Sequence, residues 1–210
     1  MRSLPGRLPS IEVCTFVALA TASLVLTASS TAVDQFRWES ARVGNEPWRF
    51  ITGHFVHLGW VHAAANIGAL AVLAWVARLR QAGSSFPACA VSSAATVSAG
   101  MAYGPVPVDW YAGLSGILYG LFAQEALRLR PFHRSFAWCG LALYFAGLVK
   151  VVADLRLGVG GAGTLGIPIV PHAHLYGYLA GSLVSLVSGL FHCGASQRRL
   201  ARPASSNRKA

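Results

Sequence analysis

Long apolar stretches alternate with short polar connections along most of the chain. A hydrocarbon core about 30 Å thick is crossed by about 20 helical residues. Six stretches approach that length, at residues 11–31, 54–77, 86–103, 113–128, 135–153 and 171–193. The pattern predicts an all-α membrane protein, a bundle of six transmembrane helices over residues 11–193. It also predicts an N-terminal tail at residues 1–10 and a basic, disordered tail at residues 194–210.

The first apolar stretch has a second interpretation. Arg2 and Arg7 precede it and small residues, Ala28 to Ala32, follow it, as in a cleaved secretory signal peptide. We favour a retained helix, because the chain that follows is itself a predicted membrane domain.

Composition supports a membrane protein. Hydrophobic residues make up 54% of the chain and charged residues 11%, and the mean hydropathy is +0.51, whereas an average soluble domain has about 25% charged residues. The cysteines form no CxxC pair and have no metal-ligand spacing, so we interpret them as small apolar residues. They are Cys14, Cys89, Cys139 and Cys193.

Basic residues mark the orientation. Most of them flank the predicted helices on the side that holds both chain ends, and the other side carries only Arg37, Arg42, Arg49, Lys150 and Arg156. The positive-inside rule therefore places both termini in the cytoplasm. The net charge of +10 reflects this topology, and the basic tail can also contact anionic lipid. We expect no nucleic-acid partner, because no soluble domain carries the basic groups.

Residues 111–120 read YAGLSGILYG and place Ser115 near the outer end of the fourth predicted helix. From Ser115 to Arg128 a helix rises about 20 Å, less than the ~30 Å core, so Ser115 should lie below the outer membrane surface. The preceding YGPVPVDWYAG holds two prolines and two glycines and cannot be a regular helix. Irregular backbone inside a membrane must be buried by protein or line a watery cavity. The sequence therefore predicts a water-accessible pocket with Ser115 at its floor.

Small residues repeat on two of the predicted helices. The sixth opens PHAHLYGYLAG, with Gly177 and Gly181 on one face, and the fourth carries Gly116 and Gly120 at the same spacing. Faces of small residues let two helix backbones approach closely. We therefore expect the fourth and sixth helices to touch along these glycines.

A close approach of these two helices would bring Ser115 to His174. A hydroxyl beside an imidazole supplies the nucleophile and base of a serine hydrolase. Tyr119, one turn below Ser115, could stack on the imidazole. A serine alone in a membrane helix more often serves packing, so the hypothesis depends on His174.

The second predicted helix carries His62 and Asn66, four residues apart on one face. Intramembrane polar side chains are costly and indicate function by default. With the Ser115 backbone N–H, these two side chains could donate to an oxyanion; the alternative is interhelical hydrogen bonding. His54 and His57 are expected to cap or bridge the segment near the entrance.

These segments resemble the three signatures of the rhomboid intramembrane serine proteases, in the family's order, over residues 46–182. The resemblance implies a six-helix fold, a Ser115/His174 dyad with no third acidic member, and an oxyanion site using His62 and Asn66. This chemistry requires no cofactor or metal. The residues that carry the resemblance are His62 and Asn66; Gly113, Leu114, Ser115, Gly116 and Tyr119; Ala173, His174, Gly177 and Gly181; and, in the first loop, Trp48 and Arg49.

Within that family, the compact size and the runs GHFVHLGWVHAAAN and WYAGLSGILYG are most similar to the rhombosortase branch. This resemblance implies a bacterial inner-membrane enzyme that cuts single-span proteins bearing a C-terminal Gly-Gly motif, a hydrophobic helix and a basic tail. Residues 155–170 match no signature, and we expect a mobile glycine-rich loop there, near the mouth of the site.

Other functions fit parts of the pattern. A metal or haem carrier could use several of the histidines, but the chain has no HExxH motif and we expect no carboxylate beside any of them. A non-proteolytic rhomboid-like binding protein would lack Ser115 or His174, and both are present. The G-x-S-x-G elbow of soluble hydrolases is absent, because Ile117 replaces its last glycine and no strand is expected before the serine. The histidines considered are His54, His57, His62, His172 and His174.

Overall fold

The protein is mostly helical in the computed structural model. The structure describes residues 9–29, 31–81, 83–129, 137–158 and 166–200. The helices are α1 (Ile11–Thr27), α2 (Ala32–Phe36), α3 (Arg49–Thr52), α4 (Trp60–Leu79), α5 (Ser85–Tyr103), α6 (Ser115–Arg128), α7 (Ala137–Leu157) and α8 (Pro171–Leu200). Two short strands, β1 (Trp38–Glu39) and β2 (Trp110–Tyr111), pair in an antiparallel ladder.

A long helix occupies each predicted apolar stretch, but several boundaries differ. The second stretch becomes helical only at Trp60, because Gly59 has a φ of 90°, which a helix cannot contain. α7 continues to Leu157, so the first part of the expected loop at 155–170 is helical. Residues 159–165 of that loop lie outside the described residues. α8 runs to Leu200, past the predicted end at residue 193.

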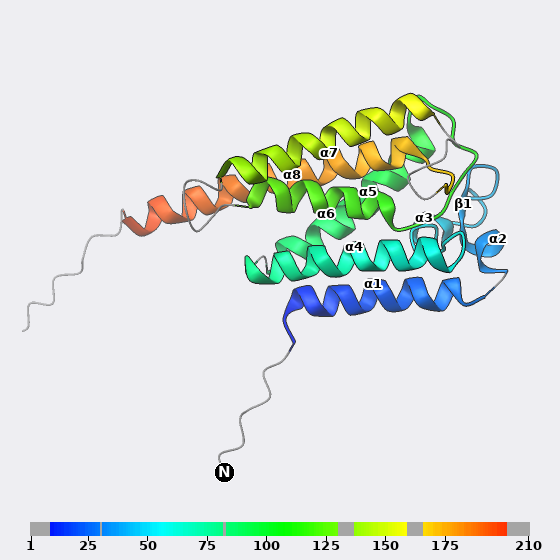
Figure 1. Cartoon of the computed structure of the whole chain (residues 1–210), viewed down its shortest axis with the longest axis horizontal. Coiled ribbons are helices and arrows are strands. Elements are labelled where there is room, and N and C mark those ends of the chain that lie inside the picture. The colour runs from blue at the N-terminus through cyan, green and yellow to red at the C-terminus, as the bar shows by residue number, and fades with distance from the viewer. Residues whose placement is uncertain (1–8, 30, 82, 130–136, 159–165, 201–210) are drawn as a thin grey trace, which may run out of the picture.

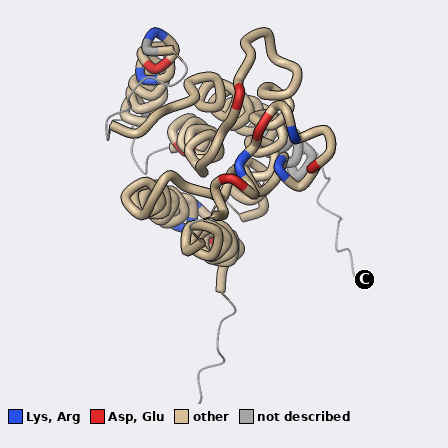
Figure 2. Tube along the Cα trace, turned by 90° about the vertical axis from the view of Figure 1, so that its right-hand side faces the viewer, with Lys and Arg blue, Asp and Glu red and all other residues tan. Residues whose placement is uncertain are grey.

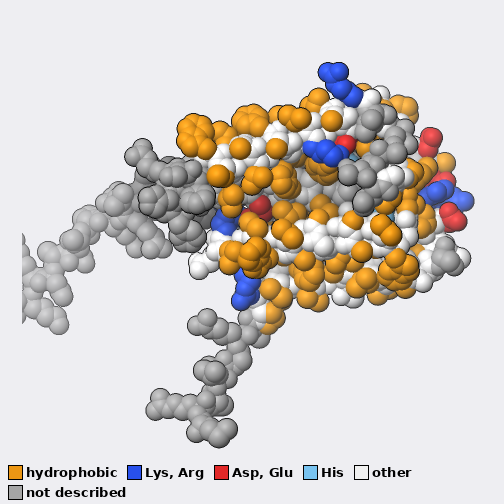
Figure 3. Space-filling view, viewed as in Figure 1, with side chains coloured by type: hydrophobic (Ala, Val, Ile, Leu, Met, Phe, Trp, Pro, Cys, Tyr) orange, Lys and Arg blue, Asp and Glu red, His pale blue; other side chains and the backbone are white. Residues whose placement is uncertain are grey.

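Two described helices are long and apolar enough to cross a membrane, Trp60–Leu79 and Trp138–Arg156, and α1 is a shorter apolar helix. Hydrophobic side chains cover the sides of the helices, whereas Lys, Arg, Asp and Glu lie mainly toward their two ends (Figure 3). A bilayer would solvate such an apolar belt.

α6 lies inside the bundle and packs most extensively against α8, with α5, α7 and α4 also in contact. Leu114, Ile117 and Leu121 at α6 are at most 1% exposed, and they form the core together with Leu70 of α4 and Phe86 of α5. α1 packs on the outer side of α4 (Figure 1). The first turn of α1 and the last turn of α8 lie at the same end of the bundle, and α2, β1 and α3 lie at the other (Figure 1).

The segment between α1 and α4 folds around Arg49, which is only 1% exposed. Its guanidinium donates to the Glu46 carboxylate at 2.6 Å and to the carbonyl oxygens of Arg37 at 2.7 Å and Asp34 at 3.0 Å. A guanidinium has five donors in a rigid fork, so one side chain can hold three points of a loop. Viewed from this end, acidic and basic residues gather in this connecting segment (Figure 2).

β1 joins this segment to the chain that precedes α6. Trp38 of β1 lies opposite Tyr111 of β2, and both side chains are 2% exposed. The expectation that no strand precedes the serine is therefore wrong: the prolines of YGPVPVDWYAG exclude a helix, but Trp110 and Tyr111 are extended and find a partner in β1. The ladder anchors the start of α6 to the segment between α1 and α4.

Candidate active site

Ser115 is the first residue of α6, where the backbone N–H groups of a helix have no partner within the helix. Gly113 just before it has a φ of 125°, which a residue with a side chain rarely adopts. Its N–H donates to the Gly53 carbonyl at 3.0 Å. The Tyr111 hydroxyl donates to the Gly113 carbonyl and accepts the Gly116 N–H at 3.3 Å. These bonds fix the turn that presents Ser115.

The four glycines on α6 and α8 bring the two backbones into direct contact, as the sequence predicted. A Cβ placed on Gly177 would stand 1.8 Å from the Gly116 carbonyl oxygen, and one on Gly181 would stand 1.8 Å from that of Gly120. Real Cβ atoms are essentially never found closer than 3.0 Å to such an atom, and ordinary van der Waals contact begins at 3.4 Å. No other residue fits at these two positions of α8 without separating the helices.

This close packing places Ser115 Oγ 3.1 Å from His174 Nε2. The imidazole is 5% exposed and stacks on the Tyr119 ring, with 4.2 Å between ring centroids and 17° between planes. The contact and the stacking that the sequence predicted are both present. Stacking limits rotation of the imidazole, so the hydroxyl faces one nitrogen of a ring held in a fixed plane.

A carboxylate lies on the far side of that ring, contrary to the expectation of no third acidic member. Asp154 Oδ2 is 3.0 Å from His174 Nδ1, and the aspartate is 1% exposed. Asp154 also shows that the expectation of no carboxylate beside any of the histidines is wrong. Asp154 is distant from His174 in sequence, and only the packing of α7 beside α8 brings the two together.

Asp154 is a site residue that the sequence reasoning missed. Tyr119 donates its hydroxyl proton to Asp154 Oδ2 at 3.0 Å, and the Lys150 ammonium donates to Oδ1. Lys150 and Asp154 lie four residues apart on α7. An acid and a base at that spacing near the end of an apolar helix are a signal that could have found the pair, since intramembrane charges are costly.

His62 and Asn66 lie on α4 beside the turn before Ser115. A Cβ on Gly113 would stand 3.0 Å from His62 Nε2 and 3.6 Å from Asn66 Nδ2. The Leu58 N–H donates to His62 Nδ1 at 3.3 Å, so the neutral ring carries its proton on Nε2. Asn66 Nδ2 is buried and makes no hydrogen bond with any residue that the structure describes. Two N–H donors therefore lie close to Ser115.

His62, Asn66, Ser115, Tyr119 and His174 line one cavity of about 230 Å³. Its wall on one side is the chain that leads into α8, and on the other it is the strand before Ser115. The lining includes Trp110, Tyr111, Ile167, Pro168, Ile169 and Val170. A larger apolar groove of about 630 Å³ adjoins it between α4 and α7, and the two share Asn66, Ser115, Tyr119 and Lys150.

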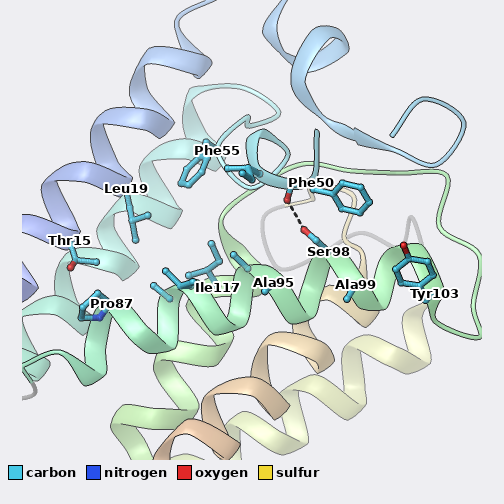
Figure 4. Close-up of a pocket in the computed structure, with 14 residues that line it drawn as sticks. Thr15, Leu19, Phe50, Phe55, Pro87, Ala95, Ser98, Ala99, Tyr103 and Ile117 are labelled. Carbon is cyan, nitrogen blue, oxygen red and sulfur yellow. Dashed lines mark hydrogen bonds between the residues drawn. The ribbon is translucent and has the colours of Figure 1, made fainter. Parts of the chain in front are cut away.

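A second apolar groove, of about 570 Å³, lies away from these residues between α1, α5 and the segment around α3 (Figure 4). Phe50, Phe55 and Tyr103 contribute aromatic rings to it, and the Ser98 hydroxyl donates to the Phe50 carbonyl at 2.6 Å. It contains no residue of the Ser115 cavity, so it is not the candidate site.

His54 and His57 are buried bridges, each 1% exposed. His54 Nε2 lies 2.9 Å from Ser98 Oγ on α5, and His57 Nδ1 lies 3.4 Å from Thr27 Oγ1 at the end of α1 and 3.0 Å from the Phe55 carbonyl oxygen. Burial lowers the pKa of each imidazole to about 4, because the charged form would lose its water. Within the described part of the chain, no three His, Cys, Asp or Glu side chains are grouped so that they could hold a metal ion.

A hydroxyl and an imidazole facing each other inside an apolar helical bundle form the arrangement of an intramembrane serine hydrolase. A family model described as the Rhomboid domain matches residues 44–191, more than half of the chain. The chain therefore belongs to the rhomboid family, which is integral to membranes and known for intramembrane serine proteases. A search among curated proteins finds no match to the chain.

Proposed function

We propose that this protein is an intramembrane serine endopeptidase that uses Ser115 as nucleophile and His174 as general base. The 3.1 Å contact between Ser115 Oγ and His174 Nε2 carries the proposal. Nε2 takes the hydroxyl proton as Oγ attacks the peptide carbonyl, and the resulting imidazolium then protonates the leaving amine. Water then attacks the acyl-enzyme as Nε2 takes its proton, and the imidazolium protonates Ser115 Oγ as the acyl group leaves as a carboxylic acid.

The charge on the attacked carbonyl oxygen requires donors placed before the reaction. His62 Nε2–H, Asn66 Nδ2–H and the backbone N–H of Ser115 are the donors that we assign. The free Asn66 amide supports this role: a buried donor without a partner costs stability and is retained where a transient acceptor will use it. Gly113, Gly116, Tyr119, Gly177 and Gly181 support the site by keeping the turn, the ring and the helix contact in place.

Six helices, α1, α4, α5, α6, α7 and α8, are proposed to span the bacterial inner membrane, with both termini in the cytoplasm. The distribution of Lys and Arg supports that orientation. Ser115 begins α6, at the end of the bundle that also holds α2, β1 and α3. The cavity would then open toward the periplasm.

The substrates that we propose are single-span membrane proteins, cut near the periplasmic end of their helix. The apolar groove between α4 and α7 supports a lateral path for such a helix, because it reaches Ser115 and shares residues with the cavity. A helix must unwind to expose a peptide bond, and glycine leaves the helix at about 1 kcal/mol lower cost than alanine. A Gly-Gly step beside a basic tail, the substrate of a rhombosortase, suits so narrow a cavity.

The test co-expresses the protein with a reporter that carries a Gly-Gly step, a hydrophobic helix and a basic tail. A second reporter has leucine in place of both glycines. We expect cleavage of the first reporter only, and loss of at least about 100-fold in Ser115→Ala and in His174→Ala, with no further loss when both changes are combined.

Each other outcome has a definite meaning. Equal cleavage of the two reporters would leave a rhomboid protease of other specificity. Cleavage by purified Ser115→Ala would overturn the dyad. No cleavage, together with no reaction between Ser115 and a fluorophosphonate probe, would identify a non-proteolytic binding protein.

A further inference from the structure

Asp154 is a buried carboxylate whose two oxygens are both occupied. Its side chain is 2% exposed. Oδ1 accepts from the Lys150 ammonium, and Oδ2 accepts from the Tyr119 hydroxyl at 3.0 Å and lies 3.0 Å from His174 Nδ1. Removing a carboxylate from water is costly unless it is paired and hydrogen-bonded. This set of three partners provides that compensation and leaves the carboxylate ionised.

An ionised carboxylate only accepts hydrogen bonds, so the contact at His174 decides where the ring proton lies. Nδ1 must carry the proton and donate it to Asp154. Nε2 then presents a lone pair to Ser115 Oγ, the state that a general base requires. In the other tautomer, Nε2 would already hold a proton and could not take one from the serine.

We propose that Asp154 is a positioning residue that completes a Ser115–His174–Asp154 relay in this helical membrane fold. It holds the reactive tautomer of His174 and stabilises the imidazolium that forms when Ser115 gives up its proton. This inference rests on the proposed function, and it departs from the acid-free dyad that the rhomboid resemblance implies. Lys150 and Tyr119 hold the carboxylate in turn.

The arrangement predicts how Asp154→Asn acts. The amide offers one oxygen and one NH2 group. Lys150 can only donate, so it selects the amide oxygen and turns the NH2 group toward His174. An NH2 group donating to Nδ1 moves the ring proton to Nε2, where it blocks the base. The substitution therefore changes the tautomer with almost no change in volume.

A fluorophosphonate probe measures this step without knowledge of the natural substrate. Ser115 Oγ forms a bond to phosphorus, the P–F bond breaks, fluoride leaves, and the hydroxyl proton passes to His174 Nε2. For Asp154→Asn in detergent, we expect the maximal labelling rate to fall at least about 100-fold. The probe concentration for half-maximal rate should stay within about twofold, because the variant leaves the cavity wall unchanged.

The pH dependence separates positioning from a structural role. Among the described residues, the groups that face His174 are Ser115 and Tyr119 of α6, Asp154 of α7 with Lys150 behind it, and His62 of α4. Loss of the carboxylate removes the negative charge that stabilises the imidazolium. The acid limb of the labelling rate should therefore move to lower pH in Asp154→Asn. Partial unfolding would lower the amplitude without moving that limb.

The matched control is Asp34→Asn, because the Asp34 side chain is 80% exposed and lies on α2, in the segment between α1 and α4. It should label like the unmodified protein. If Asp154→Asn labels at the rate of Asp34→Asn, or loses rate without a shift of the acid limb, the inference is overturned. If the unmodified protein does not label at all, the proposed function fails instead.

A measurement on the unmodified protein covers the case in which Asp154→Asn does not fold. The ring nitrogens of ¹⁵N-labelled histidine report the tautomer by NMR, and comparison with His174→Ala assigns the signals among the seven histidines. We expect His174 to carry its proton on Nδ1 at neutral pH. A proton on Nε2 would overturn the inference.

Discussion

Gly177→Ala tests whether the contact between α6 and α8 positions the Ser–His pair. The new Cβ would stand 1.8 Å from the Gly116 carbonyl oxygen, where ordinary contact begins at 3.4 Å, so the helices must part by about 1.6 Å. Overpacking of this kind costs about 1–3 kcal/mol. The 3.1 Å contact between Ser115 and His174 would be lost, and a misplacement of about 1 Å costs roughly 100-fold in rate.

The assay combines thermal unfolding in detergent with the rate of fluorophosphonate labelling at Ser115. Gly189→Ala on the same helix is the matched control, because no described atom lies within 4 Å of its Cβ position. Alanine favours a helix over glycine by about 1 kcal/mol, so the control should unfold at the same or a higher temperature and label normally. If Gly177→Ala behaves like Gly189→Ala, the reasoning from close helix contact is refuted.

Two further changes test the oxyanion donors and a buried histidine. Asn66→Ala should lower turnover by about 10-fold to 1000-fold with little change in substrate affinity, because the lost donor acts on the transition state; a loss of thermal stability with normal activity would instead indicate a packing role. Burial lowers the pKa of His54 to about 4, so the folded state keeps it neutral while the unfolded chain binds a proton below about pH 6.5. The stability that neutral His54 contributes is therefore complete above pH 6.5 and is lost as the pH falls toward 4. In His54→Gln, the unfolding temperature should depend less on pH over that range. If its pH dependence is the same as in the unmodified protein, His54 is not the cause.

The helices and the two glycine faces follow from local sequence. Apolar runs and the four-residue spacing of Gly116 with Gly120 and of Gly177 with Gly181 are properties of short segments, and helix geometry converts them directly into faces. The Ser115–His174 contact could be predicted for that reason. The helix ends predicted from local sequence differ from those in the structure by several residues at α4 and α7. Helix ends depend on single backbone angles such as that of Gly59.

Neither the fold of the segment between α1 and α4 nor the pairing of β1 with β2 could be predicted from local sequence. Arg49 holds carbonyl groups that are far from it in sequence, and β2 is extended because β1 lies beside it. A two-residue strand has no pattern of its own, so its partner decides its conformation.

By itself, the sequence determined a helical membrane protein with a serine, a histidine and two polar donors on particular helices. The tertiary structure alone decided that Asp154 meets His174. The helix on which a side chain lies, and the face of that helix, depend on residues nearby in the sequence. Its neighbours across the bundle depend on how α7 packs beside α6 and α8, and that packing is a sum of many weak contacts between distant residues.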